Sequence, residues 1–174
     1  MLFRSAPLDI TGPGEESGTY DAFVELALGP IAEKQVEAGK ITEDEAETTR
    51  PDYSTQSNDN AIIEGVAGSD TSLGWVGYAY ADQNRDTVKL LQVDGGDGCI
   101  APEPAAIADG AYPLSRTLYI YVNTAKATSN PAVKTFVDFY LGDQGFQAVA
   151  DADYIQLGGG SWAKSGTKWA AAVK

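Results

Sequence analysis

The fold is decided by the stretch Leu8-Asp9-Ile10-Thr11-Gly12-Pro13-Gly14-Glu15-Glu16-Ser17-Gly18-Thr19-Tyr20. Residues 8–11 predict a short strand, and the Gly-Pro-Gly sequence after it predicts a tight loop, because glycine and proline favour turns. A helix is predicted next, since apolar residues recur at helical spacing between Tyr20 and Leu28. Ser17 or Glu16 can cap this helix, and Gly29-Pro30 should end it. The local order is therefore strand, glycine loop, helix.

Strands and helices continue to alternate along the chain. Residues 31–49 are acidic and predict one or two exposed helices broken at Gly39. Further strands are predicted at residues 73–78, 88–93 and 118–122, and further helices at residues 61–66, 131–141 and 144–150. The segment 118–122 has the strongest β-propensity and is predicted to be a central strand. This alternation indicates α/β layering with a partly parallel sheet.

Composition excludes several classes of function. The 174 residues carry a net charge of −13, which would repel a phosphate backbone or an anionic bilayer, and no apolar run is long enough to cross a membrane. We therefore expect no nucleic-acid partner and no membrane insertion. The chain has no histidine and one cysteine, Cys99. We expect no histidine-based catalysis, no thiolate metal site and no cofactor.

The loop after the first predicted strand has the features of an anion site. Unpaired backbone amides and the positive end of the helix dipole gather where a helix begins. Gly18 lets a ligand approach the main chain closely, and the hydroxyls of Ser17 and Thr19 can donate hydrogen bonds. The alternative is an ordinary serine-capped helix. A P-loop and a nucleophile elbow are both excluded, because the lysine of the first and the G-x-S-x-G spacing of the second are missing.

Several ordered motifs together resemble the phosphate-binding proteins of bacterial ABC transporters. The resemblance runs from about Leu8 to Leu157. It is carried by Gly12-Pro13-Gly14, Ser17-Gly18-Thr19-Tyr20-Asp21, Asp52-Tyr53, Asn58-Asp59-Asn60, Leu73-Gly74-Trp75-Val76-Gly77-Tyr78-Ala79-Tyr80 and Tyr112-Pro113-Leu114-Ser115-Arg116. It implies an α/β fold of the type II periplasmic-binding-protein kind, in which two lobes joined by crossing strands close on phosphate between them. This chain is then expected to form one lobe, with a mixed sheet flanked by helices, and the C-terminal return into an incomplete first lobe.

By this resemblance Ser17, Gly18 and Thr19 hold phosphate oxygens. Family members often carry Thr-Asp before this segment, whereas this chain has Glu15-Glu16, which keeps the acidic character at Glu16.

Three further residues are weaker candidates for phosphate contacts. Arg50 is a candidate because a guanidinium matches two phosphate oxygens, although it can equally pair with neighbouring acids. Asp59 is a candidate acceptor for the proton of monohydrogen phosphate and Asn58 a candidate donor, although both residue types are also typical helix caps.

The resemblance also implies domain boundaries. Residues 1–112 correspond to the second lobe, residues 113–157 to a crossing strand and helices that return to the first lobe, and residues 158–174 to a C-terminal tail. Relative to the family the chain lacks most of the first lobe, so half of the cleft is expected to be missing. Phosphate affinity near or weaker than about 1 mM is then expected. The strand at 118–122 and the helix after it are expected to expose apolar surface, to be unstable, or to pair with a second chain.

Three hypotheses for function follow. The first is a phosphate-binding component of an ABC uptake system that delivers inorganic phosphate to a membrane permease. It would work in the periplasm or at the cell surface, with no export signal in residues 1–6. The second is a non-binding interaction or scaffold protein derived from this fold. The third, an enzyme acting on phosphate esters through a metal held by Glu15, Glu16 and Asp59, is disfavoured because no convincing carboxylate cluster is present.

Overall fold

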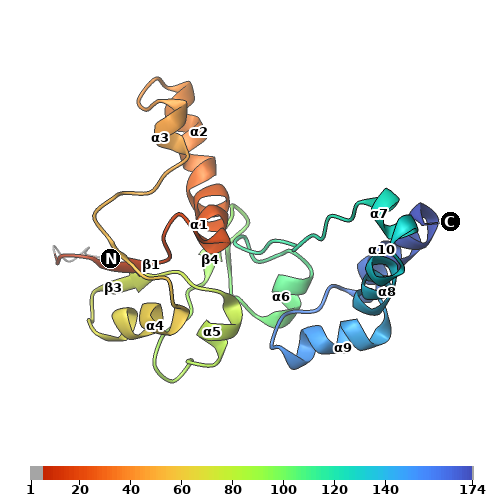
Figure 1. Cartoon of the computed structure of the whole chain (residues 1–174). Helices are drawn as coiled ribbons and strands as arrows, with labels where there is room; N and C mark the ends of the chain where they lie inside the picture. Colours follow the sequence, from red (N-terminus) through yellow and green to blue (C-terminus); the bar gives the residue numbers. More distant parts are fainter. Residues whose placement is uncertain (1–5, 174) are drawn as a thin grey trace. The chain divides into compact units, whose positions relative to one another are not determined.

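The computed structural model describes residues 6–173, which divide after Pro102 into two compact units (Figure 1). Unit 1 comprises residues 6–102 and unit 2 residues 103–173. The expectation about an export signal concerns residues that lie almost entirely outside the described part of the chain. The predicted boundaries at residues 112 and 157 stay predictions.

Unit 1 is built on a small parallel sheet. Its strands are β1 (Asp9–Gly12), β2 (Ser54–Thr55) and β3 (Ser72–Gly74), in the order β2-β1-β3. Both neighbours run parallel to β1, with Thr11 opposite Ser54 and Ile10 opposite Leu73. A separate antiparallel pair is formed by β4 (Val93–Asp94) and β5 (Cys99–Ile100). The predicted α/β class is confirmed, and the main sheet is wholly parallel over its described strands.

Helix α4 (Asp59–Ala67) covers the sheet and forms the core of unit 1. It packs against β1 and β3, and its Ile62 and Ile63 are buried. Glycine permits this close approach, because a Cβ at Gly65 would lie 2.6 Å from the Thr11 hydroxyl oxygen. The predicted helix at 61–66, with its cap at Asn58, is confirmed. A short helix, α5 (Tyr78–Asp82), follows β3.

A long helical arm leaves the loop after β1 and projects from the sheet (Figure 1). It contains α1 (Gly18–Phe23), a π-helical turn η1 (Val24–Leu28) and α2 (Gly29–Glu37), followed by α3 (Glu43–Ala46). The predicted end at Gly29-Pro30 is wrong. Pro30 lies in the first turn of α2, where no amide donor is needed, and the Gly29 amide donates five residues back to Val24. Gly39 breaks the arm as predicted, with φ of +66°.

Unit 2 is helical. Its helices are α6 (Pro104–Ala108), α7 (Thr124–Ser129), α8 (Pro131–Tyr140), α9 (Asp143–Asp151) and α10 (Gly159–Ala172). The buried core joins Ala127, Val137 and Trp169, and Val122, Val133, Leu141 and Val173 pack around it. The predicted helices at 131–141 and 144–150 are confirmed, and α7 was not predicted. Within residues 6–173, every helix is too short or too polar to traverse a lipid bilayer.

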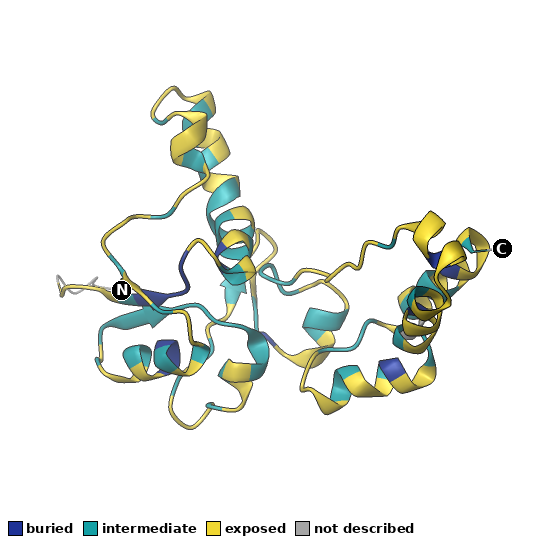
Figure 2. Ribbon diagram, in the orientation of Figure 1, coloured by how far each residue is buried: buried dark blue, intermediate teal, exposed yellow. Residues whose placement is uncertain are grey.

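The predicted strand at 118–122 is absent, because these residues have no regular secondary structure and belong to no sheet. Of the predicted strand at 88–93 only Val93 is in a strand, as the first residue of β4. The segment 118–121 is instead exposed (Figure 2). A strand needs a partner edge for its backbone hydrogen bonds, and the described residues offer none to this segment. The expected exposure of apolar surface is confirmed.

Candidate functional site

The loop between β1 and α1 is fixed by its own hydrogen bonds. Ser17 is the N-cap of α1, and its hydroxyl oxygen accepts a hydrogen bond of 3.2 Å from the Thr19 amide. The Ser17 amide donates to the Gly14 carbonyl oxygen at 3.0 Å. Both ends of the turn 14–17 are thereby held. Because the Ser17 hydroxyl uses its oxygen to cap the helix, its proton remains available to donate to a ligand.

A cluster of aromatic side chains packs against this loop. The Tyr53 hydroxyl donates to the Pro13 carbonyl oxygen at 2.7 Å, and burial raises the pKa of this phenol. The Trp75 ring stacks on Phe23 with a centroid distance of 4.3 Å and lies 5.2 Å from the Tyr53 ring. A Cβ at Gly12 would come within 2.6 Å of the Trp75 ring, so only glycine fits there. The loop is therefore held in place by the packed side chains of Phe23, Tyr53 and Trp75.

A cavity of about 250 Å³ opens beside the loop. It is lined by Pro13, Glu16, Ser17, Gln56, Ser57, Asp59 and Ile62. These residues come from two segments, one that follows β1 and one that follows β2. Because parallel neighbouring strands end at the same edge of a sheet, the two segments meet there. The cavity thus lies where ligands of open α/β sheets are usually bound.

The structure brings three of the predicted site residues together. Ser17, Glu16 and Asp59 line the cavity, with Ser17 and Asp59 at the beginnings of α1 and α4. Gly18 and Thr19 lie beside them in α1 but are not among the lining residues. The Thr19 amide is bonded to Ser17, so the amides of this loop are not all open to a ligand.

Asn58 and Arg50 are placed outside the cavity lining. Asn58 caps α4, and its side-chain oxygen accepts a 2.9 Å hydrogen bond from the Asn60 amide. Arg50 is exposed and forms a two-bond pair with Asp52, with both N···O distances at 2.5 Å. This pairing raises the pKa of Arg50 and lowers that of Asp52. Both residues take the alternative roles that the sequence left open.

Sequence reasoning missed four of the lining residues, namely Pro13, Gln56, Ser57 and Ile62. Gln56 and Ser57 follow β2, whose two residues are too few and too polar to predict a strand. The Gln56 amide donates to the Gly12 carbonyl oxygen at 2.9 Å, which extends the pairing of β2 with β1. The signal that could have located them is the cap sequence of α4, because a strand of a parallel sheet commonly precedes such a cap.

The cavity combines neutral donors with acidic acceptors. Ser17 and Ser57 contribute hydroxyl groups, Gln56 a carboxamide, and Glu16 and Asp59 carboxylates. Among residues 6–173, no group of three or more His, Cys, Asp or Glu side chains is arranged to hold a metal ion. This donor and acceptor set suits a polar ligand that can both accept and donate hydrogen bonds.

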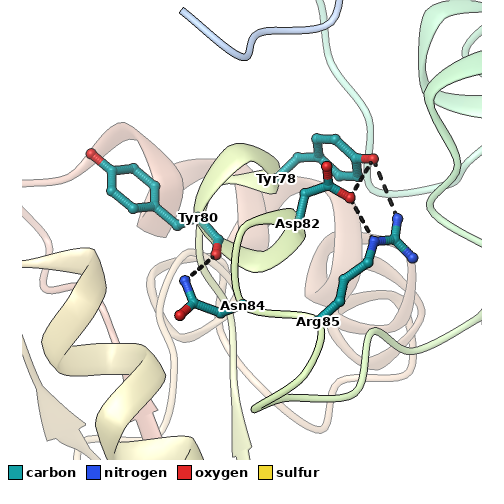
Figure 3. Close-up of polar contacts among 5 residues, drawn as sticks. All are labelled: Tyr78, Tyr80, Asp82, Asn84 and Arg85. Atoms are coloured by element: carbon teal, nitrogen blue, oxygen red, sulfur yellow. Dashed lines mark hydrogen bonds and ion pairs between the residues drawn. The ribbon is translucent and has the colours of Figure 1, made fainter.

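A second, more open hollow of about 590 Å³ runs along residues 85–90. Next to it Asp82 accepts hydrogen bonds from the Tyr78 hydroxyl at 3.0 Å and from Arg85 Nε at 2.5 Å (Figure 3). Arg85 therefore lowers the pKa of Asp82. The guanidinium is engaged by a carboxylate of its own segment, and the hollow contains none of the predicted site residues. The smaller cavity remains the candidate site.

Comparison with known proteins identifies one family and several related proteins. Residues 3–144 match the model of the PBP superfamily domain. Protein SphX of Synechocystis sp. is 36% identical over 89% of this chain, and the phosphate-binding protein PstS of Staphylococcus saprophyticus is 31% identical over 83%. The chain spans 42% of the first relative and 40% of the second.

Two solved structures share the architecture. A crystal structure described as a possible phosphate-binding protein from Planctomyces limnophilus matches 99% of this chain with a TM-score of 0.73 and 34% identity, and the match covers 56% of that protein. PstS from Borrelia burgdorferi matches 88% of this chain with a TM-score of 0.57, but at 19% identity this likeness shows the fold alone. With the family model matching most of the sequence, the chain belongs to the PBP superfamily.

Proposed function

We propose that this chain binds inorganic phosphate, or another tetrahedral oxyanion, as part of a substrate-binding protein and without catalysing a reaction. The observation that carries the proposal is the meeting of Ser17 and Asp59 at one cavity at the carboxyl edge of the sheet. Relatives named phosphate-binding proteins support it. Ser17 is one of the three residues that the resemblance assigned to phosphate, and it lines the cavity.

The chemistry of the cavity fits monohydrogen phosphate. The hydroxyls of Ser17 and Ser57 donate to phosphate oxygens, and a carboxylate of Asp59 or Glu16 accepts the remaining phosphate proton. Sulfate carries no proton at neutral pH, so the same carboxylates would face its oxygens with like charge. We therefore propose that the acidic side chains select a protonated oxyanion.

The other candidate residues enter the proposal through small rearrangements. Gly18 and Thr19 follow Ser17 directly in α1, and Asn58 precedes Asp59. Arg50 is exposed and pairs with Asp52, which is also exposed, and solvent screens such surface pairs so that they contribute little to stability. Exchange of Asp52 for a phosphate ligand therefore costs little, and Arg50 stays in the proposal as a mobile cation.

The role of the whole protein is a wider proposal, because the chain spans less than half of its curated relatives. We propose that it serves an ABC uptake system, delivers phosphate to a membrane permease and works in the periplasm or at the cell surface. In this proposal residues 1–112 act as the second lobe, residues 113–157 return to the first lobe, and residues 158–174 form a tail.

One observation favours a second candidate, an interaction or scaffold protein that no longer binds an anion. The Ser17 amide is bonded to Gly14, the Thr19 amide is bonded to the Ser17 side chain, and two carboxylates line the cavity. Each of these features reduces the attraction for a dianion. The scaffold candidate predicts a folded chain with no response to phosphate.

Titration of the whole chain with phosphate distinguishes the two candidates. We expect progressive shifts of the backbone amide resonances of Gly18 and Thr19 and measurable heat, with a dissociation constant near or above about 1 mM. Sulfate and chloride at matched ionic strength are the controls, and both should give smaller shifts. If phosphate at tens of millimolar moves these resonances no more than chloride does, the scaffold candidate is correct.

A further inference from the structure

The carboxylate of Glu16 lies folded back over the loop beside the cavity. Gly14 is buried, and a Cβ built on it would lie 3.0 Å from Glu16 Cδ and 3.1 Å from Oε1, with Oε2 closer still. The φ angle of Gly14 is not positive, so it gives no reason for glycine at this position. Glycine here therefore makes room for the Glu16 carboxylate, and Glu16 lines the cavity next to Ser17.

Of the two acidic residues that line the cavity, Glu16 is the one whose side chain is free to move. It is exposed, and within residues 6–173 it forms no ion pair and accepts no hydrogen bond. Asp59 has a shorter side chain, is partly buried and lies in the first turn of α4, which the buried Ile62 and Ile63 anchor on the sheet. The Glu16 carboxylate can therefore leave the cavity without breaking a bond to the protein.

The single proton of monohydrogen phosphate cannot serve both carboxylates. If one of them accepts this proton, the other faces an unprotonated oxygen of like charge, and such repulsion is strong over a few ångströms where water is partly excluded. An oxyanion that accepts a hydrogen bond from the Ser17 hydroxyl lies beside Glu16, because these two residues are adjacent in the chain and line the same cavity. One carboxylate must then withdraw, and the unbonded side chain of Glu16 is the one that can.

We propose that Glu16 sets the affinity of the cavity for oxyanions, because its carboxylate occupies the place beside Ser17 that a dianion takes and leaves when the dianion binds. This inference rests on the proposed function and assigns separate roles to the two acids. Asp59 stays in the cavity and accepts the phosphate proton, whereas Glu16 competes with the ligand. The competition lowers the affinity for phosphate and for sulfate by the same factor, since the carboxylate leaves in both cases.

Two substitutions in the whole chain remove this competition in different ways. Glu16→Gln keeps the shape of the side chain and removes its charge, and phosphate should then bind at least about tenfold more tightly. Gly14→Ala keeps the charge but places a methyl group where the carboxylate lies, so it should also strengthen binding. The double variant should bind no more tightly than Glu16→Gln alone, because both changes act on the same carboxylate. Glu15→Gln, at an exposed acid outside the cavity lining, is the matched control and should change the dissociation constant by less than about twofold.

Titration of each variant with phosphate and with sulfate decides the role of Glu16. Equal strengthening of both anions in Glu16→Gln supports the proposal. Weaker phosphate binding with stronger sulfate binding would make Glu16 the proton acceptor and overturn it, as would unchanged constants for both anions. If Gly14→Ala does not melt cooperatively, Glu16→Gln alone decides.

The displacement itself has a direct readout in the wild-type chain. Saturation with phosphate should remove the nuclear Overhauser contact between the α protons of Gly14 and the side chain of Glu16, and a contact that persists overturns the proposal. If the wild type and every variant bind neither anion, the proposed function fails and this inference with it. Binding that Glu16→Gln leaves unchanged overturns the inference alone.

Discussion

The hydroxyl of Tyr53 donates a 2.7 Å hydrogen bond to the carbonyl oxygen of Pro13, which lies forty residues earlier in the chain. This contact joins the residue before β2 to the loop after β1, so the loop that lines one side of the cavity is also tied, outside the sheet, to the chain that enters β2. The tie is partly buried, and its acceptor is a backbone group that no side-chain substitution can remove.

Removal of the hydrogen bond between Tyr53 and Pro13 should lower the stability of unit 1 while the packing of the aromatic rings remains. Tyr53→Phe keeps the ring that lies against Trp75 and loses only the hydrogen bond, so we expect unfolding to become easier by about 1 kcal/mol. Urea denaturation followed by tryptophan fluorescence measures the change. Tyr154→Phe, at an exposed tyrosine of unit 2, should change the stability by much less. Equal effects of the two substitutions would show that the Pro13 contact contributes nothing.

Ser17 should act in both helix capping and phosphate binding. Ser17→Ala removes the hydroxyl that caps α1 and lines the cavity, so we expect a loss of about 1 kcal/mol in stability together with weaker phosphate binding. Asn130→Ala removes a comparable cap from α8 in unit 2, where the side chain accepts from the Ala132 amide. Denaturation and phosphate titration of both variants separate the effects. Loss of phosphate response in Asn130→Ala would show that stability alone explains the result.

Asp59 should govern the choice between oxyanions. Asp59→Asn replaces a carboxylate of the cavity by a neutral amide that can donate, so sulfate binding should strengthen relative to phosphate by about tenfold. Asp21→Asn is the matched control, because Asp21 also lies in the first turn of a helix but is exposed and outside the cavity. The ratio of the two dissociation constants is the measurement. An unchanged ratio in Asp59→Asn would exclude this residue from selectivity.

Unit 2 should lose stability in acid through Asp138. Its carboxylate accepts from Lys134 and from Trp169 Nε1 at 2.7 Å each, and mainly the lysine lowers the pKa of Asp138 below its ordinary value of about 3.9. A depressed folded-state pKa gives stability that is present above the unfolded-state value and is lost as the pH falls through the folded-state value. Asp138→Asn should therefore flatten the stability profile below about pH 4.

Thermal melts followed by circular dichroism between about pH 2 and pH 6 test this expectation. Asp109→Asn, at an exposed acid that follows α6, is the control and should leave the slope of the profile almost unchanged. A variant at Asp138 that keeps the full acid dependence would place its origin elsewhere in the chain.

Local features of the fold followed from the sequence, and features that depend on distant partners did not. Ser17 and Asn58 were recognisable as caps because a cap bonds to amides two residues away. The prediction of a strand at 118–122 was wrong because, among the described residues, no strand edge pairs with this segment despite its high β-propensity. The prediction that the helix ends at Gly29-Pro30 was wrong because a π-helical turn before Gly29 accommodates the proline.

The same distinction applies to the residues of the candidate site. Ser17 and Glu16 were predicted from one continuous loop, and both line the cavity. Ser57 and Gln56 were missed, since their position depends on β2 adding beside β1 and the two residues of β2 carry no strand signal. Arg50 was predicted as a site residue because a guanidinium can bind two phosphate oxygens. In the structure it pairs with the carboxylate of Asp52 instead.

The three hydrogen bonds of the loop after β1, from Tyr53 to Pro13, from the Ser17 amide to Gly14 and from the Thr19 amide to Ser17, have a kinetic consequence. A loop already held at three points loses little conformational freedom when an anion arrives. Capture of an anion by this loop should then be a single fast step, with a rate set by encounter. Any slow relaxation in a stopped-flow trace would report movement of some other part of the molecule.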